Sequence, residues 1–140
     1  MTLSLLLLIA GVAAGVPVAL PPGEVPERWL DPLALHALEV GEVLKRGLTD
    51  VAARHPIVSD VRGEGLFVGV ELTEHPGESA AARQASYVQE RLRDHGILTG
   101  IDGPRHNVLK IKPPMVFSLE DADRVVSALD SVLVDTCLNF

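Results

Sequence analysis

The segment VRGEGLFVGVEL, at residues 61–72, limits the possible folds of this chain more than any other feature. Every second residue from 66 to 70 is a branched aliphatic one, and the alternate positions hold phenylalanine, glycine and glutamate: Leu66, Val68 and Val70 against Phe67, Gly69 and Glu71. A period of two places the two sets on opposite faces of a strand. Gly63 and Gly65 give a turn-like lead into it. The segment therefore predicts a β-strand with one apolar face.

Three stretches show helical periodicity instead. The first begins at Asp31-Pro32, which suits an N-cap followed by the first helical position, and ends at His55-Pro56, because the residue before proline avoids the α region. Its apolar face comprises Ala37, Gly41, Leu44, Leu48 and Val51. The second helix is expected over 80–95, with Gly96 as a left-handed C-cap. Ser118 is expected to cap the third, with Asp121 completing a partial capping box.

Two shorter strands are expected between the last two helices. ILTGI at 97–101 and VLKIK at 108–112 carry the β signal, and DGPRHN forms the turn between them. The predicted order is α–β–α–β–β–α. This order indicates an α+β fold, with helices on one face of a small, mostly antiparallel sheet.

Lys110 and Lys112 are the most informative polar residues of the chain. Residues two apart in a strand share a face, so both ammonium groups lie together while Leu109 and Ile111 pack on the other side. Two like charges repel unless water or an anion separates them. The pair is therefore either a solvated face that protects the sheet from aggregation, or an anion site for a carboxylate or phosphate. The double proline that follows ends the strand and directs the chain.

Two arginines are weaker candidates for the same anion. Arg62 lies beside two glycines and either approaches an anion or makes a structural hydrogen bond. Arg105 lies in the turn before the lysine strand and either extends a positive patch or is a solvated turn residue. The five histidines show no metal-ligand spacing, so no metal site is predicted.

The N-terminal 30 residues differ from the rest of the chain. Residues 2–20 form a 19-residue uncharged run, and a proline-rich arm follows at 17–29. The run is a bilayer span, a signal-peptide core or a leader foreign to the functional domain. The absence of Lys or Arg before Arg28 weighs against the first two. A net charge of −7 argues against nucleic acid as a partner, and the lone Cys137 excludes an internal disulfide.

The segments HPIVSDVRGEGLFVGVEL at 55–72 and YVQERLRDHGILTGIDGPRHNVLKIKPPMVFSLEDADRVVSALDSVL at 87–133 resemble class III aminotransferases. The resemblance covers residues 38–140 and is strongest to the phosphoethanolamine and phosphohydroxylysine phospho-lyase branch. It implies a pyridoxal-phosphate enzyme of fold type I, of which residues 31–140 are the C-terminal small domain. Residues 1–30 do not resemble the family.

The resemblance also implies roles and absences. A basic residue three before the first proline binds the substrate carboxylate in related aminotransferases, and Lys110 stands there, with lysine in place of the common arginine. The Schiff-base lysine, the acidic partner of the pyridine nitrogen and the phosphate loop belong to a large domain that precedes this segment. None is found here, so no catalytic or cofactor-binding residues are predicted.

The resemblance further implies a parent enzyme that is a cytoplasmic homodimer and acts on small amine or amino-acid substrates, by transamination or phosphate elimination. This chain alone is expected to be inactive and to bind no pyridoxal phosphate. The alternative is a secreted or membrane-tethered binding domain without catalysis, anchored by residues 2–20.

Overall fold

The computed structural model describes residues 31–74 and 79–135. Those from Leu33 onward belong to one compact unit. The elements follow the order α2 (Pro32–Arg54), β1 (Val58–Glu64), β2 (Phe67–Leu72), α3 (Ala82–Asp94), β3 (Gly100–Asp102), β4 (Val108–Ile111) and α4 (Leu119–Leu133). The strands form one four-stranded sheet in the order β1-β2-β4-β3, and every neighbouring pair is antiparallel. The predicted α+β class is confirmed.

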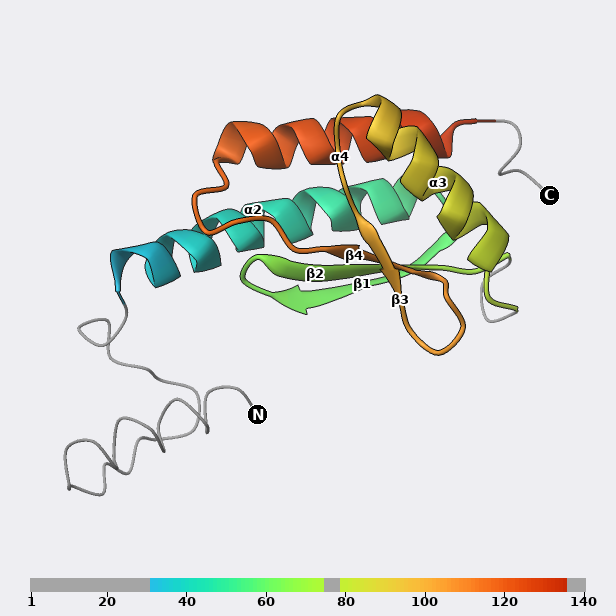
Figure 1. The fold of residues 1–140 in the computed structure, drawn as a ribbon, viewed down its shortest axis with the longest axis horizontal. Helices are drawn as coiled ribbons and strands as arrows, with labels where there is room; N and C mark the ends of the chain where they lie inside the picture. The colour runs from blue at the N-terminus through green and yellow to red at the C-terminus, as the bar shows by residue number, and fades with distance from the viewer. Residues whose placement is uncertain (1–30, 75–78, 136–140) are drawn as a thin grey trace, which may run out of the picture. The chain divides into compact units, whose positions relative to one another are not determined.

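The helices lie on one side of the sheet, as Figure 1 shows. The core between the two layers is almost entirely aliphatic. Its fully buried large side chains come from α2 (Leu44, Leu48, Val51), β2 (Val68, Val70, Leu72), β4 (Leu109), α3 (Val88, Leu92) and α4 (Leu129, Val132). Because the chain has few aromatic residues, Leu and Val side chains fill most of the core.

The predicted single strand at 61–72 is wrong in one respect. The structure has a hairpin here, β1 followed by β2, so the order of elements is α–β–β–α–β–β–α. Gly65, with φ of 55°, forms the reversal between the strands together with Leu66, whereas Gly63, with φ of 144°, lies within β1 opposite Val68. The alternation itself is confirmed, because Leu66, Val68 and Val70 are buried and Phe67 is exposed.

The remaining elements differ from expectation only at their ends. The strand predicted at 97–101 begins later, at Gly100. Gly96 adopts φ of 74° after α3, as the left-handed cap predicts. The Ser118 hydroxyl accepts a hydrogen bond from the Asp121 N–H, and the Asp121 carboxylate accepts one from the Ser118 N–H, so the capping box of α4 is complete.

Several expectations concern residues outside the described part of the chain. The uncharged run 2–20, the proline-rich arm and Cys137 all lie there. Within residues 31–74 and 79–135, no helix is long and apolar enough to cross a membrane.

Candidate functional site: the open face of the sheet

The sheet face that carries no helix, here called the open face, holds the predicted anion-binding lysines. Lys110 lies on β4, in the interior of the sheet, with its buried neighbours Leu109 and Ile111 directed to the helices. Its cross-strand partners are Gly69 on β2 and Gly100 on β3. Because neither glycine has a side chain, no side chain stands opposite Lys110 on either neighbouring strand, and its aliphatic part lies over Gly100.

The Lys110 ammonium group is held by one carboxylate. Its Nζ lies 2.8 Å from Asp102 Oδ2, and the Gly103 N–H donates to Asp102 Oδ1 at 2.8 Å. The hydrogen bond from Lys110, supported by that backbone donor, holds the pKa of Asp102 below its ordinary value. Both side chains remain more than a third exposed, so an anion in solution can reach the pair.

Beside Lys110 the open face is hollowed. The hollow has a volume of about 440 Å³ and is lined by Arg62, Gly63, Phe67, Val68, Gly69, Asp102, Gly103, Val108 and Lys110. Two of the four predicted anion-binding residues, Arg62 and Lys110, therefore line one cavity.

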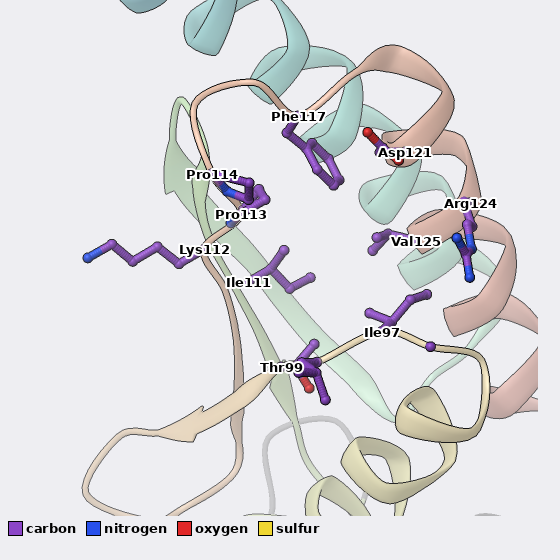
Figure 2. Close-up of a pocket in the computed structure, with 12 residues that line it drawn as sticks. Ile97, Thr99, Ile111, Lys112, Pro113, Pro114, Phe117, Asp121, Arg124 and Val125 are labelled. Carbon is purple, nitrogen blue, oxygen red and sulfur yellow. The ribbon is translucent and has the colours of Figure 1, made fainter.

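Lys112 does not line this hollow. Its Nζ lies 5.8 Å from the centroid of the Phe67 ring, a cation–π distance. Figure 2 shows its side chain pointing away from the neighbouring Ile111. The structure thus confirms that both lysine side chains lie on the sheet face opposite Leu109 and Ile111. Their neighbours differ, because Lys110 contacts Asp102 and Lys112 lies near Phe67.

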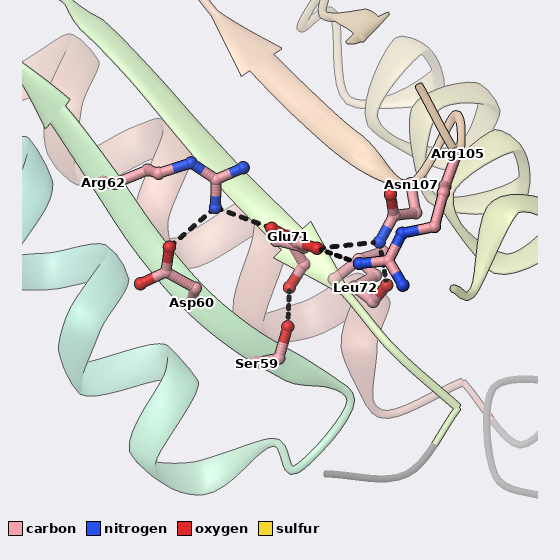
Figure 3. Close-up of polar contacts among 7 residues, drawn as sticks. All are labelled: Ser59, Asp60, Arg62, Glu71, Leu72, Arg105 and Asn107. Carbon is pink, nitrogen blue, oxygen red and sulfur yellow. Dashed lines mark hydrogen bonds and ion pairs between the residues drawn. The ribbon is translucent and has the colours of Figure 1, made fainter. Parts of the chain in front are cut away.

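Arg62 and Arg105 meet at one carboxylate, that of Glu71 (Figure 3). Arg62 Nη1 donates to Glu71 Oε2 at 2.7 Å and to Asp60 Oδ2 at 2.6 Å. Arg105 Nη2 donates to the other oxygen of Glu71 at 3.1 Å. The hydrogen bond from Arg62 is the main reason that the pKa of Glu71 lies below its ordinary value. Arg62 thus makes structural hydrogen bonds, which was the alternative to an anion-binding role. Its partners lie on strands β1 and β2 rather than in a loop.

Asn107 is a residue that the sequence analysis missed. It is almost fully buried, and its Nδ2 donates to the Leu72 carbonyl at 2.7 Å and to Glu71 Oε1 at 3.3 Å. The backbone carbonyl of Asn107 accepts a hydrogen bond from the Leu72 N–H at 2.9 Å. Asn107 therefore fixes the end of β2 to the start of β4 and holds Glu71 in place. The one feature of the sequence that could have pointed to Asn107 is its position directly before an apolar strand.

A second hollow, of about 270 Å³, lies under the double proline between β4 and α4 (Figure 2). Ile97, Ile111, Phe117 and Val125 form its apolar lining. His36 on α2 donates from Nε2 to the Phe117 carbonyl at 2.8 Å, which fixes the far side of the loop after Pro114. Lys112 is one of the residues that line this hollow, although its side chain points away from Ile111 (Figure 2).

The described residues do not fit pyridoxal phosphate. The chain has three lysines, and a Schiff base needs one that is unpaired and enclosed. Lys45 pairs with Glu42 on the surface of α2, Lys110 pairs with Asp102, and Lys112 is exposed beside Phe67. For metals, residues 31–74 and 79–135 contain no cluster of three or more His, Cys, Asp or Glu side chains that could hold an ion.

Comparison with known proteins identifies the family. The profile of the family described as Aminotransferase class-III matches residues 28–133. Ethanolamine-phosphate phospho-lyase homolog 1 of Caenorhabditis elegans is 39% identical over 103 residues, which are 70% of this chain and 21% of the relative. The mitochondrial alanine–glyoxylate aminotransferase 2 homolog 2 of Arabidopsis thaliana is 38% identical over 96 residues, 68% of this chain and 20% of the relative.

Solved structures agree with these sequences. A phospholyase from Arthrobacter, in complex with phosphoethanolamine, matches with a TM-score of 0.70 and 35% identity, over 74% of this chain and 25% of that one. A Bacillus anthracis aminotransferase matches with a TM-score of 0.68 and 28% identity, over 72% and 24%. The chain spans about a fifth of the length of the curated relatives it matches. It belongs to the class III aminotransferase family and has the fold of part of a fold-type I enzyme.

Proposed function

We propose that residues 31–140 act as the C-terminal small domain of a pyridoxal-phosphate enzyme, and that their part in catalysis is to bind the anionic group of an amine or amino-acid substrate through Lys110. The reaction is transamination or phosphate elimination. The observation that carries the proposal is the position of Lys110, in the middle of the open face, between two glycines and accessible to solvent.

Phosphate elimination is the reaction that the lysine favours. An arginine presents a planar fork that matches a carboxylate with two hydrogen bonds, whereas lysine is a point charge with three rotatable donors. A lysine ammonium group can therefore donate hydrogen bonds to a tetrahedral phosphate as well as to a planar carboxylate. Two of the similar proteins are named as phospho-lyases, and one was solved with phosphoethanolamine.

The chain acts only together with a cofactor-binding domain. Pyridoxal phosphate, when bound in such a domain, supplies the electron sink for reactions at the carbon that bears the amine. The lysines of this chain are surface groups, two of them paired with carboxylates, so none is placed to hold the cofactor. We propose, as the family resemblance implies, that the parent enzyme is a cytoplasmic homodimer.

A chimera tests the proposal. Residues 31–135 replace the corresponding segment of the C. elegans phospho-lyase homolog, and phosphate release from phosphoethanolamine and keto-acid formation from alanine are both measured. The chimera is expected to release phosphate. In the chimera, Lys110→Gln is expected to raise KM about tenfold or more, because a charge-assisted hydrogen bond is lost.

The matched control is Lys45→Gln, which removes a surface lysine on α2, the helix on the covered side of the sheet. It should leave KM unchanged. A folded chimera with equal KM in both lysine variants would contradict the role of Lys110. The full 140-residue chain, mixed with pyridoxal phosphate, should give no imine absorbance band, and a band reducible by borohydride onto one lysine would contradict the dependence on a second domain.

A further inference from the structure

One row of residues crosses the open face from β1 to β3. The register pairs Arg62 with Gly69, Gly69 with Lys110, and Lys110 with Gly100. Arg62 and Lys110 are therefore the two side-chain-bearing residues of this row, and a glycine separates them. Both line the hollow of about 440 Å³ described above.

The spacing of the two cations suits one shared ligand. Adjacent strands lie about 4.8 Å apart, so the Cα atoms of Arg62 and Lys110, two strands apart, are separated by about 9.6 Å. Each side chain reaches about 6 Å from its Cα by standard bond lengths. The Lys110 side chain lies over Gly100 and its ammonium group pairs with Asp102. An anion over Gly69 is therefore contacted by Arg62 from one side, and by Lys110 from the other once the ammonium group turns from Asp102 toward β2.

Gly69 keeps the space between the cations open. A Cβ at this position would approach Val108 Cγ1 to 3.1 Å, so any larger residue would crowd the floor of the hollow. Phe67 and Val108 supply apolar walls. Such walls suit the organic part of a ligand, and the volume lies in the range of small-molecule sites.

The cations keep donors available for a ligand. Both hydrogen bonds of Arg62 leave from Nη1, so its Nη2 and Nε have no partner among residues 31–74 and 79–135. Lys110 has three ammonium donors and uses one on Asp102. Glu71 and Asp60 hold the Arg62 guanidinium in a fixed place and do not fill the hollow, since neither lines it.

We propose that Arg62 and Lys110 together form a binding site for a phosphate monoester, with Gly69 as its floor. The proposal rests on the proposed function for Lys110 and adds a second cation that distinguishes phosphate from carboxylate. A phosphate monoester carries about two charges and three acceptor oxygens, enough for both cations. A carboxylate carries one charge and is satisfied by Lys110 alone.

The experiment is an NMR titration of the full chain, labelled with ¹⁵N, with methyl phosphate and with acetate at equal ionic strength and pH 7.5. The backbone amide of Gly69 and the Arg62 Nε–H report on the hollow. Methyl phosphate is expected to shift both signals and to bind about tenfold more tightly than acetate. Equal affinities for the two anions would overturn the proposal.

Arg105 provides the matched control, because it too binds Glu71 but does not line the hollow. Arg62→Gln is expected to weaken methyl phosphate binding about tenfold, from the loss of one charge-assisted contact. Arg105→Gln should stay within about twofold of the wild type by the same reasoning. Arg62→Lys keeps the charge and should restore binding to within about threefold, which guards against a loss of folding in Arg62→Gln.

Lys110→Gln separates this proposal from the proposed function. If Lys110→Gln abolishes binding and Arg62→Gln does not weaken it, the two-cation site is overturned while the role of Lys110 stands. If neither variant weakens binding, the two-cation site is overturned, and the chimera assay decides the role of Lys110. Equal losses in the Arg62 and Arg105 variants would show general charge attraction and would also overturn the site.

Discussion

Gly41 of α2 lies directly against Gly65 in the turn between β1 and β2. A Cβ built on Gly41 would overlap the Gly65 carbonyl oxygen and come within 2.7 Å of Gly65 Cα. Gly65 itself needs a positive φ, at 55°. Each glycine thus meets a separate requirement, and together they let the hairpin turn approach the helix more closely than any other residue pair would allow.

Gly41→Ala is therefore expected to destabilise the fold. Alanine is the better helix residue by about 1 kcal/mol, so propensity alone would predict a gain. The clash is with backbone atoms, which cannot rotate away, and overpacking of this kind costs about 1–3 kcal/mol or more. The expected net loss is about 2 kcal/mol, measured as a lower urea midpoint.

Gly47→Ala is the control within the same helix. Its Cβ would meet the side chain of Val126, at 2.7 Å from Cγ2, rather than backbone. Val126 is only partly buried and can give way, so the net change should lie within about 1 kcal/mol of zero. If Gly41→Ala loses as little stability as Gly47→Ala, the turn does not approach α2 as closely as described here.

Asn107→Asp is expected to be severely destabilising at pH 7. The substitution keeps the shape but replaces the Nδ2 donor with an oxygen, 2.7 Å from the Leu72 carbonyl and 3.3 Å from Glu71 Oε1. A buried carboxylate facing two acceptors should reduce the free energy of unfolding by about 3 kcal/mol, because the hydrogen bond is lost and a charge is left unpaired. Thermal or urea unfolding measures the loss.

The comparison variant is Gln89→Glu. Gln89 Nε2 also donates to a backbone carbonyl, that of Thr99 at 2.7 Å, but its side chain is only partly buried. The same chemical change there should cost about 1 kcal/mol, since water can reach the new charge. Equal losses in the two variants would argue against Asn107 as the buried link between β2 and β4.

The fold could be read from the sequence where the periodic signal was strong. Leu66, Val68 and Val70 alternate clearly, and their burial is as predicted. β1 was missed because its only inward apolar residues are Val58 and Val61, and an irregular register between Val58 and Asp60 breaks the alternation. An edge strand with most of its side chains exposed carries little of the signal on which periodicity depends.

The site could be predicted only in part, for a different reason. The shared face of Lys110 and Lys112 follows from strand geometry alone. Their partners do not, because Asp102, Phe67 and Gly69 come from other elements, and only the register of the sheet brings them to the lysines. Glu71 gave no signal of its own, although it joins Arg62, Arg105 and Asn107.

The stability of the fold should fall with acid in a way that depends on Glu71. The pKa of Glu71 is lower in the folded state, chiefly through the hydrogen bond from Arg62. Its stabilisation is therefore complete above the unfolded pKa of about 4.3 and is lost as the pH falls through the lower folded value. Glu71→Gln should be about 1 kcal/mol less stable than the wild type at pH 7, with a smaller difference at pH 3.

Glu90→Gln is the matched control for this pH series. Glu90 pairs with Arg93 on α3, and both side chains are more than half exposed. An ion pair of this kind contributes little, so Glu90→Gln should match the wild type within about 0.5 kcal/mol at both pH values. A Glu71→Gln protein with the wild-type acid profile would contradict the role of Glu71 as the shared partner of the two arginines.

Exposed apolar side chains should make the chain self-associate. Leu98 is 84% exposed and Val116 is 74% exposed, and Met115 and Leu119 beside Val116 are also exposed. Leu98 borders the hollow under the double proline, so part of this surface lies at its rim. In dilute buffer, light scattering after size-exclusion chromatography is expected to show species larger than a monomer, for residues 31–140 and more strongly for the full chain.

Replacing Leu98 and Val116 together by serine is expected to shift residues 31–140 toward the monomer without loss of stability, because neither side chain is buried in the core. The paired control replaces the exposed residues Arg93 and Glu120 by serine, which changes the surface but removes no apolar area. That control should leave the oligomer distribution as it is. A clean monomer for the unsubstituted full chain in plain buffer would show that this apolar surface is covered or too dispersed to drive association.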